Sequence, residues 1–257
     1  MSNPLTTTAG RLPRLAVLID ADNILARHAE AILDELAGHG EPTVRRVYGD
    51  WSSQALSSWK EKARSLGLVM HQQSANTKGK NASDIGLVID AMDILHAGKV
   101  DGFVLVSSDS DFTRLASRIR EDGLLVIGVG EAKTPESLRK VCNRFLLIEN
   151  IVAGDDALPA PVGEKPRAER AEVPAPALGV KRPAMEAIPL VVDAMRKIDA
   201  DQDWYPLGQL GQFMTQLFPD FDSRSYGAPK LSDLLRKIPR FEVAQAPGGQ
   251  LQVRDKA

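Results

Sequence analysis

The chain has a single cysteine, Cys142, so it cannot form an internal disulfide bond. It also has no apolar run near the ~18 residues that a membrane-spanning helix needs. The first ten residues contain no hydrophobic segment, so we expect no signal peptide. One free thiol fits a reducing compartment, and together these absences predict a cytoplasmic protein with no membrane partner.

An excess of positive charge is missing as well. The net charge is −2, although 26% of the residues are charged. This balance excludes a globally basic nucleic-acid-binding protein, but it leaves room for a local basic patch. Hydrophobic residues make up 43% of the 257 residues, which is enough for real cores in one large domain or two smaller ones.

The order of the segments predicts two folded domains joined by a linker. Residues 13–152 alternate short apolar runs with helical patterns, which is typical of βαβ units and a parallel sheet flanked by helices. Residues 153–184 are rich in proline and contain no aromatic residue, so we expect an extended linker. Residues 185–255 show three helical segments and two short strand-like pieces, the outline of a small winged helix-turn-helix domain.

Residues 83–96 form a clear helical pattern in the first domain. Apolar side chains recur there with the 3.6-residue period of a helix, at Ile85, Val88, Ile89, Met92 and Leu95. We expect this face to pack on the sheet. Asp90 falls nearly opposite to it and is therefore predicted to be solvated.

Polar residues gather where predicted strands end or helices begin. They are Asp20, Asp22, Asn23, Asp84, Asp109 and Asp111. Ligands of a parallel sheet bind beyond the carboxyl ends of its strands. Carboxylates that meet there repel one another, so a hard divalent cation is the simplest partner. Two alternatives stay open, because Asp84 also suits the first turn of any helix and Asp111 also suits an N-cap.

Three segments of the first domain resemble the NYN domain, a PIN-like ribonuclease family. They are LAVLIDADNI, KGKNASDIGLVIDAMDIL and FVLVSSDSDFTRLASRIREDGLLVIGVG, and the resemblance covers residues 13–152. It implies a PIN-type α/β/α fold, a Mg²⁺ or Mn²⁺ site and cleavage of single-stranded RNA.

The same resemblance implies a role for each site residue. The catalytic and metal-binding acids would be Asp20, Asp84, Asp109 and Asp111. The supporting residues would be Asn23, Asp22, Ser107 and Ser108. Lys78 and Lys80 match basic residues that precede the second acid in the family, and they would contact RNA phosphate. An equal alternative is that both are ordinary solvated lysines of a loop.

The last segment, from WYPLGQLGQFMTQLFPDFDSRSYG onward, resembles the OST-HTH (LOTUS) domain, whose members bind RNA or proteins. The candidate RNA contacts, through stacking and phosphate pairing, are Arg224, Tyr226, Lys230, Arg236 and Lys237. The charge of this region is nearly balanced and gives no support of its own. A protein partner is therefore the alternative to RNA for this domain.

The sequence thus predicts a metal-dependent ribonuclease with a tethered RNA-binding module. One alternative is a non-catalytic RNA-binding or scaffold protein that kept the fold. Another is a haloacid-dehalogenase-like phosphatase, because Asp20-Ala21-Asp22 imitates a nucleophile and acid pair. The tight spacing of Asp109 and Asp111 departs from the pattern of the phosphatase family.

Overall fold

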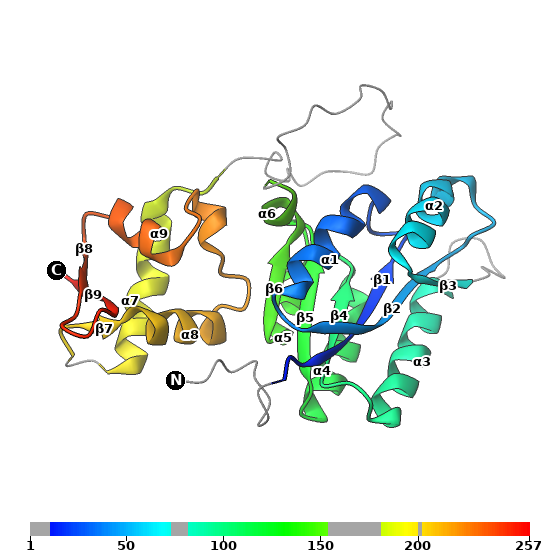
Figure 1. Ribbon diagram of the computed structural model, residues 1–257, viewed down its shortest axis with the longest axis horizontal. Helices are drawn as coiled ribbons and strands as arrows, with labels where there is room; N and C mark the ends of the chain where they lie inside the picture. Colours follow the sequence, from blue (N-terminus) through cyan, green and yellow to red (C-terminus); the bar gives the residue numbers. More distant parts are fainter. Residues whose placement is uncertain (1–10, 73–81, 154–180, 200–201) are drawn as a thin grey trace, which may run out of the picture. The chain divides into compact units, whose positions relative to one another are not determined.

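The computed structural model describes residues 11–72, 82–153, 181–199 and 202–257 (Figure 1). The chain divides into two compact units, Met1–Pro176 and Ala177–Ala257. Lys78, Lys80 and residues 154–180 of the predicted linker lie outside the described residues. Within the described ranges, no helix combines the length and the apolarity that crossing a bilayer requires.

The first unit is built on a six-stranded sheet with the order β3-β2-β1-β4-β5-β6, and every neighbouring pair is parallel. The strands are β1 (Arg14–Asp20), β2 (Glu41–Gly49), β3 (Val69–Gln72), β4 (Gly102–Val106), β5 (Leu125–Gly130) and β6 (Arg144–Leu147). The central strands β1 and β4 are almost wholly buried, because helices cover both faces of the sheet.

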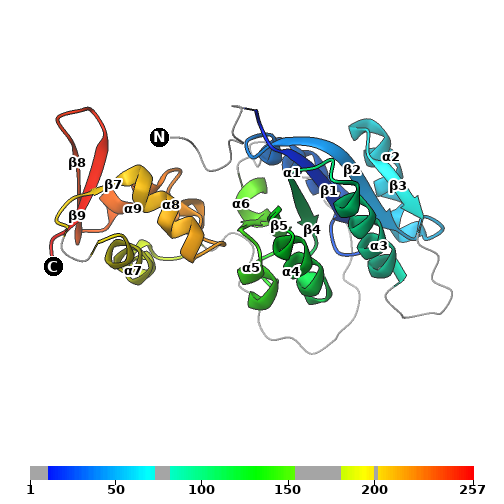
Figure 2. The same cartoon turned by 90° about the horizontal axis from the view of Figure 1, so that it is seen from below.

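Helices pack on both faces of this sheet, as Figure 2 shows. One face carries α1 (Ala29–Ala37), α2 (Ser57–Leu66) and α6 (Ile148–Val152). The other carries α3 (Ala82–Ala97), α4 (Thr113–Glu121) and α5 (Glu136–Val141). Short 3₁₀ turns precede three of the helices: η1 (Ala26–His28), η2 (Gln54–Leu56) and η3 (Ser110–Phe112). The predicted α/β/α class of this domain is confirmed.

The alternation of side chains along β1 decides on which face its last residue emerges. Leu15, Val17 and Ile19 belong to the core under α1, α2 and α6. Ala16 and Leu18 belong to the core under α3, α4 and α5. Side chains of a strand point alternately to opposite faces, so Asp20 continues the second series and lies on the side of α3.

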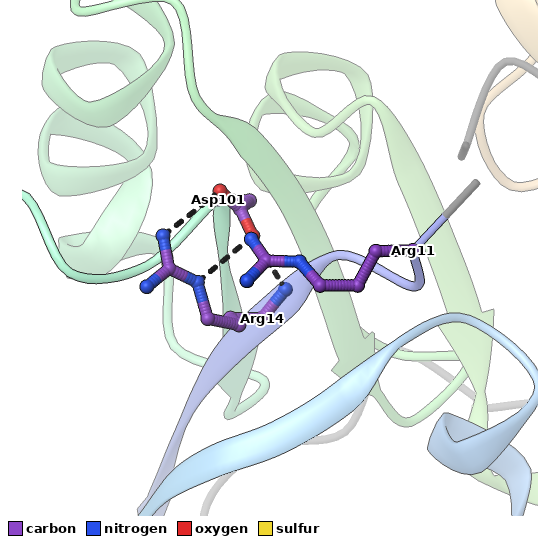
Figure 3. A network of polar contacts seen from close by, with 3 residues as sticks. All are labelled: Arg11, Arg14 and Asp101. Atoms are coloured by element: carbon purple, nitrogen blue, oxygen red, sulfur yellow. Dashed lines mark hydrogen bonds and ion pairs between the residues drawn. The ribbon is translucent and has the colours of Figure 1, made fainter. Parts of the chain in front are cut away.

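The amino ends of the two central strands are joined by an ion-pair network, shown in Figure 3. The backbone N–H of Arg14 donates to Asp101 Oδ2 at 2.7 Å, and the Arg14 Nε donates to the same oxygen at 3.2 Å. Arg11 Nη2 lies 3.3 Å from Oδ2. The hydrogen bond from the Arg14 side chain is the main cause that holds the pKa of Asp101 below its ordinary value.

The predicted inner face of α3 is wrong in part. Leu95 is buried, and Val88 and Met92 pack against the core, as expected. Ile85 and Ile89, however, are 62% and 58% exposed, and Leu87 and Ala91 are buried against the sheet in their place. The helix carries apolar residues on both faces, so the 3.6-residue period alone does not identify the inner one. Asp90 was predicted to be solvated, and this too is wrong, because its carboxylate contacts Arg46 and Tyr48 of β2.

The second unit contains three α-helices and a small antiparallel sheet of order β7-β9-β8. Its elements are η4 (Ala184–Ala187), α7 (Ile188–Ile198), β7 (Tyr205–Pro206), α8 (Leu207–Leu217), η5 (Ser223–Tyr226), α9 (Leu231–Lys237), β8 (Phe241–Gln245) and β9 (Leu251–Asp255). The three helices and the terminal hairpin agree with the sequence prediction. The two-residue strand β7 is an addition that is too short to leave a periodic signal.

Candidate active site

Asp20 is the last residue of β1 and is only 1% exposed. Three donors hold its carboxylate. Asn23 Nδ2 donates to Oδ2 at 2.6 Å, Ser107 Oγ donates to Oδ2 at 3.0 Å, and the backbone N–H of Asp22 donates to Oδ1 at 3.1 Å. These bonds fix the carboxylate at the carboxyl end of the sheet, where ligands of parallel sheets bind.

The charge of Asp20 has no cationic partner among the described residues, since none of the ion pairs formed there includes it. Burial raises the pKa of Asp20, and the hydrogen bonds from Asn23 and Ser107 offset only part of that effect. Such a carboxylate is costly to keep ionised in the folded protein. A bound cation at this position would remove that cost.

Ser107 connects Asp20 to the second acidic cluster. It follows β4 directly, and its hydroxyl donates to Asp20 while it accepts the backbone N–H of Asp109 at 3.1 Å. Asp109 caps η3, because its Oδ1 accepts the backbone N–H of Asp111 at 3.0 Å. The capping bond occupies one carboxylate oxygen, Oδ1, and the described residues give no such bond to the other, Oδ2.

Two neighbouring residues of the cluster differ in their surroundings. Ser108 is buried, and its hydroxyl accepts the backbone N–H of Glu131 at 2.9 Å, which joins the ends of β4 and β5. Asp111 is exposed and lies within η3. More hydrogen bonds therefore separate it from Asp20 than separate Asp109 from Asp20. Ser107 and Ser108 therefore organise the ends of β4 and β5 around Asp20.

Asp84 lies in the first turn of α3, and its side chain is outside the described set. The helix spans 16 residues and ends five residues before β4 begins, so it runs from the carboxyl edge of the sheet to the amino edge. Its length of about 24 Å matches that path. The backbone thus brings the start of α3 to the edge, and to the face, where Asp20 emerges.

Three further polar residues at this edge escaped the sequence prediction. Glu131 follows β5 directly, and Glu149 lies in the first turn of α6, where its Oε1 accepts the backbone N–H of Ala132 at 2.8 Å. His28 is partly buried, and burial lowers its pKa, while the charges of Glu131 and Glu149 oppose that shift. The rule that selected Asp20, an acid directly after a buried strand, would have selected Glu131 as well.

The donor set at this edge suits a hard divalent cation. Asp20 and Asp109 offer carboxylate oxygens, and the nearby hydroxyls of Ser107 and Ser108 are also oxygen donors. Such oxygen-only sets match Mg²⁺ and Mn²⁺ rather than softer metals. Among the side chains that the structure describes, which exclude Asp84, no three acidic, histidine or cysteine groups already form a compact metal cage.

The predicted RNA contacts of the second unit differ in availability. Tyr226 is only 5% exposed and the guanidinium of Arg182 lies 5.0 Å from the centre of its ring, so little of the ring is free for a base. Arg224 pairs with Asp222 at 2.7 Å, and Lys237 Nζ donates to the carbonyl of Gly227 at 2.5 Å.

Lys230 and Arg236 are the more accessible members of this set. Both are exposed on or beside α9, and Arg236 has only a loose contact of 3.7 Å with Asp233. Phosphate pairing through these two side chains is therefore easier to achieve than stacking on Tyr226.

Comparison with protein families gives two matches. The NYN domain matches residues 14–149, and the OST-HTH/LOTUS domain matches residues 181–253. None of the curated proteins matches the chain. The first match contains Asp20, Asp84, Asp109 and Asp111, and the second contains all the residues discussed on α9.

Some solved structures have a partial likeness to the chain. A protein of unknown function from Vibrio parahaemolyticus is 20% identical, covers 58% of this chain and 96% of its own, and has a TM-score of 0.46. An uncharacterized protein from Nitrosomonas europaea is 30% identical over 37% of this chain and 93% of its own, with a TM-score of 0.26. MurG from Acinetobacter baumannii is 13% identical, covers 81% and 65%, and has a TM-score of 0.36.

Proposed function

Since the chain belongs to the NYN domain family of PIN-like nucleases, we propose that it is a Mg²⁺- or Mn²⁺-dependent ribonuclease that cleaves single-stranded RNA. A second, OST-HTH/LOTUS domain accompanies the nuclease domain and is of a type that binds RNA. We assign residues 13–152 to the nuclease domain, 153–184 to the linker and 185–255 to the RNA-binding module.

One observation carries this proposal: a buried carboxylate that has no cation beside it in the described structure. Asp20 is held by three hydrogen-bond donors, yet burial still raises its pKa. Structural carboxylates are normally neutralised by a nearby arginine or lysine. A carboxylate kept in this state at the carboxyl end of a parallel sheet is a candidate functional group.

The protein side chains have distinct tasks in this scheme. Asp20, Asp84, Asp109 and Asp111 would hold the metal ion, and Asn23 and Ser107 hold the Asp20 carboxylate in place for it. Asp22 contributes its backbone N–H to the same carboxylate, and Ser108 keeps the end of β4 against β5. When bound, the ion supplies Lewis-acid stabilisation of a phosphate oxygen and of the leaving oxygen.

RNA recognition is divided between the two domains in this proposal. Lys78 and Lys80, beside the second acid in the sequence, would pair with phosphates near the scissile bond. Lys230 and Arg236 would pair with phosphates on the second domain, where both side chains are exposed. Tethering the module to the nuclease domain raises the local concentration of RNA near the acids.

The test is cleavage of a labelled single-stranded RNA pool by the full chain, with Mg²⁺ or Mn²⁺ and with a chelator. We expect metal-dependent cleavage, and we expect Asp20→Asn to lower the rate at least about 100-fold, because even groups behind a metal ligand contribute up to about that factor. Asp101→Asn is the matched control, because it removes a carboxylate at the opposite end of the same strands.

The same reactions distinguish the alternatives. Hydrolysis of a generic phosphomonoester, without RNA cleavage, would indicate a phosphatase of the haloacid-dehalogenase type. RNA binding without any metal-dependent cleavage would indicate a non-catalytic RNA-binding or scaffold protein. Equal cleavage rates for the wild type and Asp20→Asn would refute the assigned site, even if the chain proved to be a nuclease.

A further inference from the structure

Asp90 lies in the middle of α3 and joins this helix to two strands of the sheet. Its carboxylate accepts hydrogen bonds from the guanidinium of Arg46 and from the hydroxyl of Tyr48, both on β2. His71 of β3 places its Nδ1 3.7 Å from the same carboxylate. Most of the surface of the Asp90 and Arg46 side chains is covered, at 19% and 28% exposure. The contacts form a polar cluster between α3 and the sheet.

The contacts within this cluster set the charge states of Asp90 and Tyr48. Burial acts to raise the pKa of Asp90, but the bonds from Arg46 and Tyr48 outweigh it and leave the pKa below its ordinary value. Burial and the bond to Asp90 both raise the pKa of Tyr48. At neutral pH, Asp90 is therefore an ionised acceptor and Tyr48 a protonated donor, so the bonds between them are directional and charge-assisted.

Directional bonds matter for α3 because its apolar pattern does not determine its rotation. Leu87 and Ala91 are buried on the sheet, yet Ile85 and Ile89 on the outer face are comparably apolar and more than half exposed. Burial of apolar area is non-directional and distinguishes such faces poorly. Asp90 can contact Arg46 and Tyr48 in only one rotation of α3 about its axis and at one position along that axis. The cluster therefore specifies how α3 packs on the sheet.

This cluster lies next to the candidate active site, on the same face of the sheet. Tyr48 is the register partner of Asp20 in the pairing of β1 with β2, and both side chains belong to the face that α3 covers. Asp84 precedes Asp90 by six residues, which is about 9 Å along a helix and toward the carboxyl edge. Helical spacing also puts position 84 in line with Leu87 and Ala91, the positions that face the sheet.

We propose that Asp90, through Arg46 and Tyr48, is a positioning residue that sets the start of α3, and with it Asp84, against Asp20. The inference rests on the proposed nuclease function and adds to it a residue that touches neither metal nor RNA. Its action is to fix the separation of two metal-binding acids that come from different elements. Displacement of a reacting group by about 1 Å from a remote mutation costs up to about 100-fold in rate.

The test uses full-length Asp90→Asn, which keeps the side-chain shape and removes the charge. We expect a saturated RNA cleavage rate at least about 10-fold lower, weaker Mn²⁺ binding by electron paramagnetic resonance, and an unchanged RNA concentration for half-maximal rate. Tyr48→Phe removes only the hydroxyl of Tyr48 from the cluster and should show the same changes at smaller size. Asp101→Asn, which breaks an arginine–aspartate contact at the far end of the sheet, should change neither the cleavage rate nor Mn²⁺ binding.

A double-mutant comparison separates positioning from general stability. If Asp90 acts through Asp84, the variant with both Asp84→Asn and Asp90→Asn binds Mn²⁺ no more weakly than Asp84→Asn alone. If Asp90→Asn and Tyr48→Phe both cleave RNA at the wild-type rate and bind Mn²⁺ with wild-type affinity, per folded molecule, the positioning role is overturned while the nuclease function stands. A wild type that neither binds Mn²⁺ nor cleaves RNA would overturn the function and, with it, the role of Asp90.

Discussion

Two carboxylates at opposite ends of the central strands β1 and β4 have contrasting surroundings. At the amino end, Asp101 is surrounded by the charges of Arg11 and Arg14, and its pKa is held below the ordinary value (Figure 3). At the carboxyl end, Asp20 is more deeply buried, receives only uncharged donors, and has a raised pKa. The same two strands thus carry a compensated and an uncompensated acid.

This difference separates a structural role from a functional one. A carboxylate with two arginines holds strands together and gains from being ionised. A buried carboxylate with neutral donors reduces stability in its ionised form, so a fold that keeps one has a reason beyond stability. We therefore propose that a metal ion binds at the carboxyl end, and substitutions at the two ends test this difference.

Ser107→Ala should have the larger effect, on catalysis. Its hydroxyl is the only described bridge between Asp20 and the backbone of Asp109, so its loss removes one of the two hydrogen bonds to Asp20 Oδ2 and frees the turn after β4. We expect the rate of RNA cleavage at saturating metal to fall about 10- to 100-fold with a small change in stability. Single-turnover kinetics measure this rate. An unchanged rate would show that the bridge does not orient the acids.

Asp101→Asn should have the smaller effect, on stability alone. The folded-state pKa of Asp101 is depressed, so its contribution is present above the unfolded-state value and is lost as the pH falls through the folded-state value. We expect a free energy of unfolding about 1 to 2 kcal/mol lower than that of the wild type at pH 7, because part of the pair is exposed to water.

The pH dependence provides the control for this second substitution. Chemical denaturation of both proteins should show the difference shrinking in acid, once Asp101 is protonated in the folded wild type. RNA cleavage at pH 7 should be unaffected. A stability difference that persists in strong acid would mean that packing, rather than the charge of Asp101, is responsible.

The strands and the acids that end them were predictable because their signals are local. Buried strands of a parallel sheet are short continuous apolar runs, and Asp20 follows one of them directly while Asp109 follows another after two serines. The order of strands and helices then implies that these ends meet at one edge. Family resemblance added the domain types, which the matches over residues 14–149 and 181–253 confirm.

Other features depend on contacts between distant parts of the chain, and they were missed for that reason. The inner face of α3 could not be chosen from a helix that carries apolar residues on both faces, and so the contacts of Asp90 with β2 were not foreseen. Tyr226 looked like a stacking residue in sequence, yet the packing of the second unit buries it. The bond from Ser107 to Asp20 joins residues 87 positions apart.

Thermal unfolding of the wild type and Asp20→Asn, each with and without Mn²⁺, tests whether Asp20 holds a metal ion. Without metal, Asp20→Asn should be the more stable protein by about 1 kcal/mol, because a buried uncompensated charge is gone. Saturating Mn²⁺ should raise the unfolding temperature of the wild type and leave that of Asp20→Asn nearly unchanged. A wild type that ignores Mn²⁺, or an Asp20→Asn variant that is less stable without metal, would contradict the assignment of this acid to a metal site.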